Sequence, residues 1–318
     1  MARPALSATR AVDVLNFMAA NPLEAYSLSE LAEHLALNVS SCHALLAALT
    51  RDGCLERHPK HRTYRLGVAL IAIGDGALQC HRAVDIGRDQ ARELARELDL
   101  ETLLTSRVGD RLLALARSGR PSSPAASLRV GQSMPLVPPL GTPFIAWAPP
   151  NEVEAWLARS PVPLDRIARS RYLESLELVR QRGFFVSLRN PAQTRLGETV
   201  LGLSSMPHSA DLQNRVAALI GELGDEYLLG ELEPDARYPA SMLSVPIFDG
   251  HGRVSYTLAL LGFRDALSAS ELQHYAERLA HAAGMVMHLT GGRAPRAIET
   301  AAKPKVATPV VRKSKARA

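Results

Sequence analysis

Three stretches with apolar residues at helical spacing begin the chain of 318 residues. The first covers residues 7–20 and ends at an Asn-Pro pair, where proline cannot continue the helix. The second follows Ser27, whose spacing to Glu30 is that of a capping box. The third follows Asn38, a favoured helix cap, and its apolar stripe comprises Cys42, Leu45, Leu46 and Leu49. Two short helices, a tight turn and a third helix predict a helix-turn-helix.

A hairpin pattern follows the third helix. Gly53 is placed to end that helix, and residues 54–57 and 63–66 predict two short strands around the basic segment 58–62. Such a wing can lie against phosphates or the minor groove, while the first residues of the third helix contact base edges. The residues expected to contact DNA are Ser27, Ser40, Ser41, His43, Ala44, Lys60, His61, Arg62 and Tyr64. A helix-turn-helix that serves only protein contacts is the alternative.

The pattern then changes from helices to a mixture of strands and helices. Residues 68–100 hold two amphipathic stretches that predict helices between two domains. Strand hairpins interleaved with helices follow, which is typical of an α+β domain. The expected hairpins lie at 102–117 and 244–262, and the expected helices at 151–159, 165–181 and 270–289.

Helix starts in this second part are also predicted from local signals. Thr142 and Pro143 are suited to be a cap and a first helical position, and Asn151 with Glu154 has the spacing of another cap pair. Within residues 193–240 an apolar helical stripe predicts an ordered insertion, with Leu212, Val216, Leu219, Ile220 and Leu223 as its members.

The predicted fold class is therefore multi-domain, α and α+β. Residues 1–67 form a winged helix-turn-helix, 68–100 are linker helices, and 101–290 form the α+β domain that contains the 193–240 insertion. Residues 291–318 are expected to be a disordered basic tail, because they lack apolar periodicity.

Length and composition support a globular protein of two domains, and the net positive charge belongs to the C-terminal tail. The chain is 47% apolar and 22% charged, and it has no run near the ~20 apolar residues of a membrane span, so a cytoplasmic location without a membrane partner is expected. Three cysteines argue against a disulfide framework. From Arg293 onward eight Lys and Arg face one acid, which gives 8 − 1 = +7; the net charge of +5 leaves 5 − 7 = −2 for the rest.

No catalytic pattern is present in the sequence. It has no Gly-x-Ser-x-Gly elbow and no Walker loop, and the glycines at 74 and 76 are not followed by the third glycine of a dinucleotide loop. Cys54, His58 and His61 lie on the wing without a clear fourth ligand. We therefore expect neither an enzyme nor a metal or cofactor.

The N-terminal residues resemble the DNA-binding domain of the IclR family of bacterial regulators. The matching pieces are AVDVL at 11–15, LSELAE at 28–33, SSCHALL at 40–46, GCLER at 53–57 and YRLG at 64–67. A weaker similarity, in LRVGQSMPL at 128–136, VRQRGF at 179–184 and SVPIFD at 244–249, is to that family's GAF-like effector-binding domain. The resemblance implies an operator-binding regulator, active as a homodimer or homotetramer, that senses a small molecule.

The chain departs from the family pattern at positions where the family commonly has charged residues. Val39 and Ala44 stand where the family commonly has lysine and arginine, so two phosphate or base contacts are missing. Thr142 follows Gly141 where the family often has a lysine beside the ligand. We therefore expect an effector more apolar than a small dicarboxylate.

The effector pocket is expected between the sheet and the apolar, proline-rich segment 134–147. Its candidate residues are Met134, Leu136, Val137, Leu140, Thr142, Phe144, Ser187, Arg189 and Ser244. The alternative is that this segment forms only ordinary core and loop and lines no ligand pocket. For the whole chain, the alternatives to a ligand-responsive regulator are an effectorless architectural DNA-binding protein whose C-terminal domain only oligomerises, and a GAF-like domain with hydrolytic activity.

Overall fold

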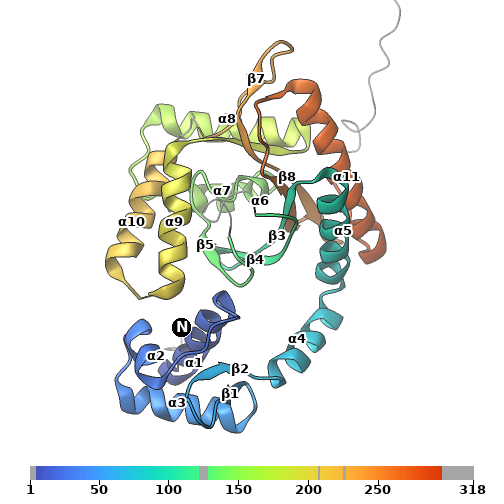
Figure 1. Cartoon of the computed structure of the whole chain (residues 1–318). Coiled ribbons are helices and arrows are strands. Elements are labelled where there is room, and N and C mark those ends of the chain that lie inside the picture. Colours follow the sequence, from blue (N-terminus) through green and yellow to red (C-terminus); the bar gives the residue numbers. More distant parts are fainter. Residues whose placement is uncertain (1–4, 122–127, 207, 225–226, 296–318) are drawn as a thin grey trace, which may run out of the picture.

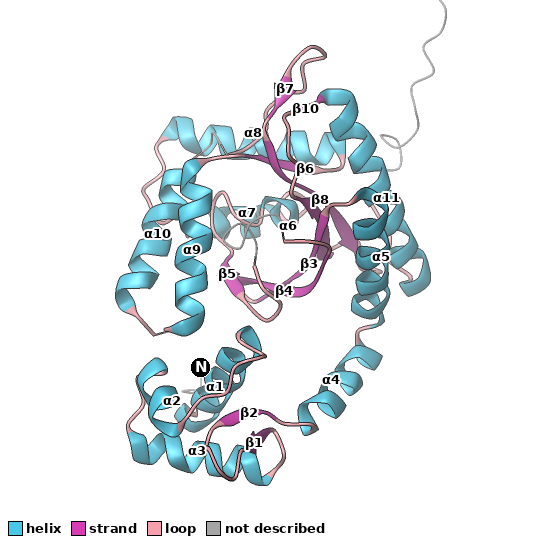
Figure 2. Ribbon diagram, in the orientation of Figure 1, coloured by secondary structure: helices cyan, strands magenta, loops and turns pink. Residues whose placement is uncertain are grey.

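The computed structural model describes residues 5–121, 128–206, 208–224 and 227–295 (Figure 1). It has a small N-terminal domain, two connecting helices and a larger α+β domain (Figure 2). This confirms the predicted fold class. The predicted basic tail lies almost wholly outside the described residues. None of the helices over the described ranges combines the length and apolar character needed to cross a membrane.

The N-terminal domain is a helix-turn-helix whose second and third helices begin at the predicted caps. In the capping box the Ser27 hydroxyl accepts from the Glu30 amide and the Glu30 carboxylate accepts from the Ser27 amide. The Asn38 side chain accepts from the Ser41 amide at 2.7 Å and so begins the third helix. The helices are α1 (Leu6–Ala20), α2 (Leu28–His34) and α3 (Val39–Arg51).

A two-stranded wing completes this domain. Strands β1 (Leu55–Arg57) and β2 (Tyr64–Leu66) pair antiparallel, and Arg62 turns the chain between them in the left-handed conformation, with φ 56°. Tyr64 is buried in the core that the three helices share, where it packs with Leu31 and Leu46. Its ring is therefore unavailable to DNA, which corrects its prediction as a contact residue.

The connecting helices α4 (Ala69–Cys80) and α5 (Arg82–Leu98) differ in what they bury. Helix α5 packs its apolar side on the larger domain through Val84, Ala91 and Leu94. Helix α4 has no buried residue, although Asp75 is its only charged residue.

A six-stranded antiparallel sheet forms the centre of the larger domain, with strand order β5-β4-β3-β9-β8-β6. Helices α5 and α11 (Ala269–Thr290) cover one face and make a core with the buried side chains of β8 and β9. Figure 2 shows helices formed by residues 142–157 and 191–223 on the other side of the sheet. The strands are β3 (Glu101–Val108), β4 (Arg111–Ser118), β5 (Ser133–Pro135), β6 (Phe185–Leu188), β8 (Ala240–Phe248) and β9 (Val254–Leu261); β7 (Arg237–Tyr238) and β10 (Leu267–Ser268) form a separate pair.

Five helices enclose a second core opposite α5 and α11. They are α6 (Thr142–Ile145), α7 (Pro150–Leu157), α8 (Arg166–Arg182), α9 (Pro191–Ser205) and α10 (Ala210–Leu223), while α11 spans Ala269–Thr290. The stripe predicted in residues 193–240 is the buried face of α10. Helix α9, which packs against α10, was not predicted.

Two predicted helix starts in this part are wrong. The cap of α6 is Gly141, and the Thr142 hydroxyl donates to the Pro139 carbonyl at 2.7 Å instead of accepting an amide. Helix α7 begins at Pro150, so Asn151 and Glu154 lie inside it and form no cap pair. In both cases the residue at the N-cap position, Gly141 for α6 and Pro149 for α7, has no side-chain oxygen that could accept a backbone amide.

Candidate DNA-binding surface and ligand cavity

Helix α3 lies on the side of the N-terminal domain that faces away from the larger domain (Figure 1). Cys42 and Leu46 point into the core, while Ser40, His43 and Ala44 are exposed. The Ser40 hydroxyl donates to the Asn38 side chain at 3.0 Å, and Ser41 is half-buried beside it. The start of α3 is therefore open to a base edge, and three of its side chains are small enough to let the helix approach closely.

The wing brings a second set of predicted residues to the surface. Lys60, His61 and Arg62 are all exposed at its tip. The turn is held by His58, whose Nδ1 accepts from the amides of Lys60 and His61. By contrast, the Ser27 hydroxyl is engaged in the capping box, so its observed role is to begin α2.

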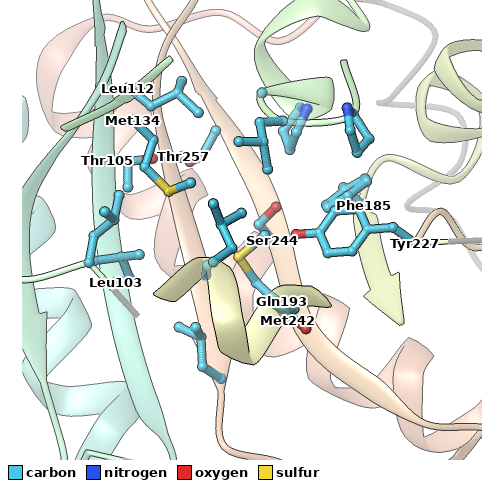
Figure 3. Close-up of a pocket in the computed structure, with 18 of the residues that line it drawn as sticks. Leu103, Thr105, Leu112, Met134, Phe185, Gln193, Tyr227, Met242, Ser244 and Thr257 are labelled. Atoms are coloured by element: carbon cyan, nitrogen blue, oxygen red, sulfur yellow. Dashed lines mark hydrogen bonds between the residues drawn. The ribbon is translucent and has the colours of Figure 1, made fainter. Parts of the chain in front are cut away.

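An apolar cavity of about 140 Å³ lies in the larger domain, between the sheet and helices α6 and α9. The sheet provides one wall through Leu103 and Thr105 of β3, Met242 and Ser244 of β8, and Thr257, Ala259 and Leu261 of β9. Figure 3 shows Phe185 and Tyr227 on one side of the cavity, across from Leu103, Leu112 and Met134. These residues come from strands and loops that are distant in sequence.

The segment 136–146 forms a second wall, and side chains outside the cavity hydrogen-bond to its backbone. The Trp156 indole donates to the Leu140 carbonyl at 3.0 Å, and Arg159 donates to the Leu136 carbonyl at 3.1 Å. Gly141 sits at a close approach, since a Cβ there would lie 2.1 Å from the Leu136 side chain, and its φ is +82°. This segment is thus held rigidly against the cavity.

Helix α9 forms the third wall. Gln193, Leu196, Gly197 and Val200 of α9 line the cavity. The other end of α9 reaches the N-terminal domain, where His208, three residues past the helix, lies 3.5 Å from the Asp13 carboxylate of α1. One helix therefore contacts both the cavity and the DNA-binding domain.

Polar groups in the cavity wall are few and mostly paired. The Thr105 and Thr257 hydroxyls lie 2.6 Å apart and hydrogen-bond each other. Burial raises the pKa of the Tyr227 phenol, opposed by its hydrogen bond with Ser187. Ser244 is only 2% exposed, and its hydroxyl has no hydrogen-bond partner among the described residues.

Four of the nine predicted effector residues line this cavity: Met134, Leu140, Phe144 and Ser244. Leu136, Val137 and Thr142 belong to the same segment but do not line it. Ser187 is buried and pairs with Ser241 at 2.8 Å. Arg189 lines a neighbouring cavity, and its guanidinium donates to the backbone carbonyls of 240 and 263–265.

The α9 wall was missed by sequence reasoning, although the sequence contains its signal. Asn190-Pro191 is a helix start, and the Asn190 side chain accepts from the Ala192 amide at 2.8 Å. Leu196 and Val200 follow at helical spacing. Among the described residues, no group of three or more His, Cys, Asp and Glu side chains is placed to hold a metal ion.

These features define a class of protein: a DNA-binding transcriptional regulator with a second domain that encloses a cavity. Residues 7–59 match the family model of the IclR helix-turn-helix domain. The glycerol operon regulatory protein of Streptomyces griseus is 28% identical over 265 residues, which are 81% of this chain and 98% of that protein.

Solved structures share the whole fold. An IclR transcriptional regulator from Alicyclobacillus acidocaldarius has a TM-score of 0.63 at 19% identity, over 91% of this chain and all of that one. An IclR homologue from Microbacterium hydrocarbonoxydans, solved in complex with 4-hydroxybenzoate, has a TM-score of 0.57 at 18% identity, over 88% of this chain and 97% of that one. Residues 7–59 thus match the IclR helix-turn-helix domain, and the chain as a whole is similar to DNA-binding transcriptional regulators of the IclR type.

Proposed function

We propose that this regulator is controlled by a small, largely apolar effector bound in the cavity between the sheet and α9. The observation that carries the proposal is an apolar cavity with one unpaired buried hydroxyl, in the domain attached to the helix-turn-helix. Ligand sites are typically apolar with a few placed polar groups. The 4-hydroxybenzoate complex of the Microbacterium relative supports the same use of the fold. Because its partner is DNA, we place the protein in the cytoplasm.

We further propose that α3 is the recognition helix for a double-stranded operator. Its exposed Ser40, His43 and Ala44, with Ser41 beside them, are in position to contact base edges in the major groove. The exposed Lys60, His61 and Arg62 of the wing supply phosphate contacts, which position the domain without selecting sequence.

The active form is proposed to be a homodimer that assembles through α4, alone or within a tetramer. A predominantly apolar helix normally packs against a partner, yet Ile71 and Ile73 of α4 are strongly exposed in the single chain. The partner proposed for this exposed apolar surface is α4 of a second copy of the chain, because a two-fold axis pairs the same patch on both subunits. A dimer also provides two recognition helices for a pseudopalindromic operator.

Two routes connect the proposed effector site with the DNA-binding domain. The connecting helices α4 and α5 are the covalent route, and we expect effector binding to change the spacing of the wings through them. The contact of α9 with α1 is a second, non-covalent route that starts at the cavity wall itself.

The experiment is a thermal-unfolding screen of metabolites on the full chain, followed by DNA titration with and without each hit. A ligand that binds only the folded state raises its stability, and a true effector also changes operator affinity. A hit that stabilises the chain but leaves operator affinity unchanged would contradict the coupling. Failure of a broad screen to stabilise the chain would favour the architectural DNA-binding protein.

A further inference from the structure

Charge is absent from the described residues that line the cavity. Among the described residues that line it, none is Asp, Glu, Lys, Arg or His. Arg189, the arginine predicted for the site, directs its guanidinium to four backbone carbonyls. A carboxylate that entered would lose its hydration without gaining a cation, and this loss is costly in an apolar surrounding.

The volume limits the size of the occupant. The cavity measures about 140 Å³, whereas an engineered apolar protein cavity of about 150 Å³ accepts benzene. One aromatic ring with a small substituent is therefore the expected upper size. Phe185 and Tyr227, whose ring centroids are 6.3 Å apart, give one wall an aromatic surface.

Ser244 offers the ligand a buried, unpaired hydroxyl, and Gln193 of α9 is a second polar side chain in the wall. Ser244 lies on β8, where its backbone pairs with Phe185 on one side and Ala259 on the other, and both of those residues line the cavity. The hydroxyls of Thr105 and Thr257 are already bonded to each other. A buried hydroxyl without a partner is destabilising until a hydrogen bond is supplied.

We infer that the cavity selects an uncharged ligand about the size of one substituted aromatic ring, anchored by a hydrogen bond to the Ser244 hydroxyl. This rests on the proposed function of the cavity and states the chemistry of its ligand. This chemistry differs from that of a regulator that holds its ligand through a carboxylate, because none of the described lining residues is a cation that could pair with one.

The test uses benzamide and benzoate, which have nearly the same shape and differ in charge at neutral pH, with benzyl alcohol and phenol as further neutral probes. Affinities for the full chain are measured by calorimetry. We expect benzamide to bind at least about 100-fold more tightly than benzoate. Ser244→Ala should weaken benzamide binding by roughly tenfold and leave the ligand-free chain at least as stable as the wild type.

Ser241→Ala is the matched control, because Ser241 is on the same strand but outside this cavity and its hydroxyl pairs with Ser187. Its benzamide affinity should equal that of the wild type. Gln193→Lys, at the start of α9, should raise benzoate affinity by introducing a cation.

Three results would overturn the inference: benzoate binding as tightly as benzamide, Ser244→Ala retaining full benzamide affinity, or no binding of any neutral probe. DNA binding is measured on the same samples. If one of these three results is found but the chain still binds DNA sequence-specifically, the inferred class of ligand is wrong and the proposed DNA recognition is unaffected.

Discussion

Replacing Ile71 by glutamate should dissociate the proposed dimer. Ile71 is 73% exposed in the single chain, so most of its side chain is available for burial by a partner. Full burial of an isoleucine contributes about 1.5–3 kcal/mol, and a two-fold axis counts each substitution twice. The loss is therefore about 3–6 kcal/mol per dimer, which raises its dissociation constant by roughly 100- to 10,000-fold.

The assay is analytical ultracentrifugation over a range of protein concentrations, with Ile167→Glu as the matched control. Ile167 is 65% exposed on α8, far from α4 in the sequence, and its substitution should leave the association constant unchanged. Both variants should keep the wild-type circular dichroism, because neither side chain belongs to a core cluster. A wild-type monomer, or an Ile71→Glu variant that still dimerises as the wild type does, would refute the role of α4.

Three further predictions concern stability and charge. Leu46→Ala, at a fully buried position of α3, should destabilise the DNA-binding domain by about 2–5 kcal/mol in urea unfolding, and an unchanged midpoint would contradict the assigned core. Hydrogen bonds from Ser27 lower the pKa of Glu30 below its usual 4.5, so this stabilisation is complete above pH 4.5 and is lost as the pH falls through the folded-state pKa; Glu30→Gln should reduce the acid sensitivity of that domain, and an identical pH profile would argue against it. Truncation after Gly292 removes seven net positive charges and should weaken binding to all DNA alike with a shallower salt dependence, about 0.9 per lost phosphate contact; a loss confined to the operator would contradict the proposed role of the tail.

The N-terminal domain could be predicted closely because its determinants are local. The capping box of Ser27 and the Asn38 cap each act within three residues. The wing register follows from two short strands around one turn. Tyr64 is the exception, since its place in the strand was predicted but its burial depends on packing against helices that lie earlier in the chain.

The cavity could be predicted only in part because its walls come from separate regions of the chain. Ser244 and the segment around Leu140 were identified from composition. The orientation of Ser187 and Arg189 away from the cavity depends on hydrogen bonds to residues more than 50 positions away. Helix α9 had a clear start signal at Asn190-Pro191, but its packing on the sheet follows from tertiary contacts alone.

The most direct test of the account is whether α3 reads DNA sequence. A binding site is first selected from a random duplex pool, and the wild type and the Ser41→Ala/His43→Ala variant are then titrated with that site and with a scrambled duplex. Each good base contact contributes about 1–3 kcal/mol of discrimination, so the variant should lose roughly 10-fold or more in affinity for the selected site and keep its affinity for the scrambled one. Full retention of the wild-type preference by the variant would contradict the assignment of α3 as the recognition helix.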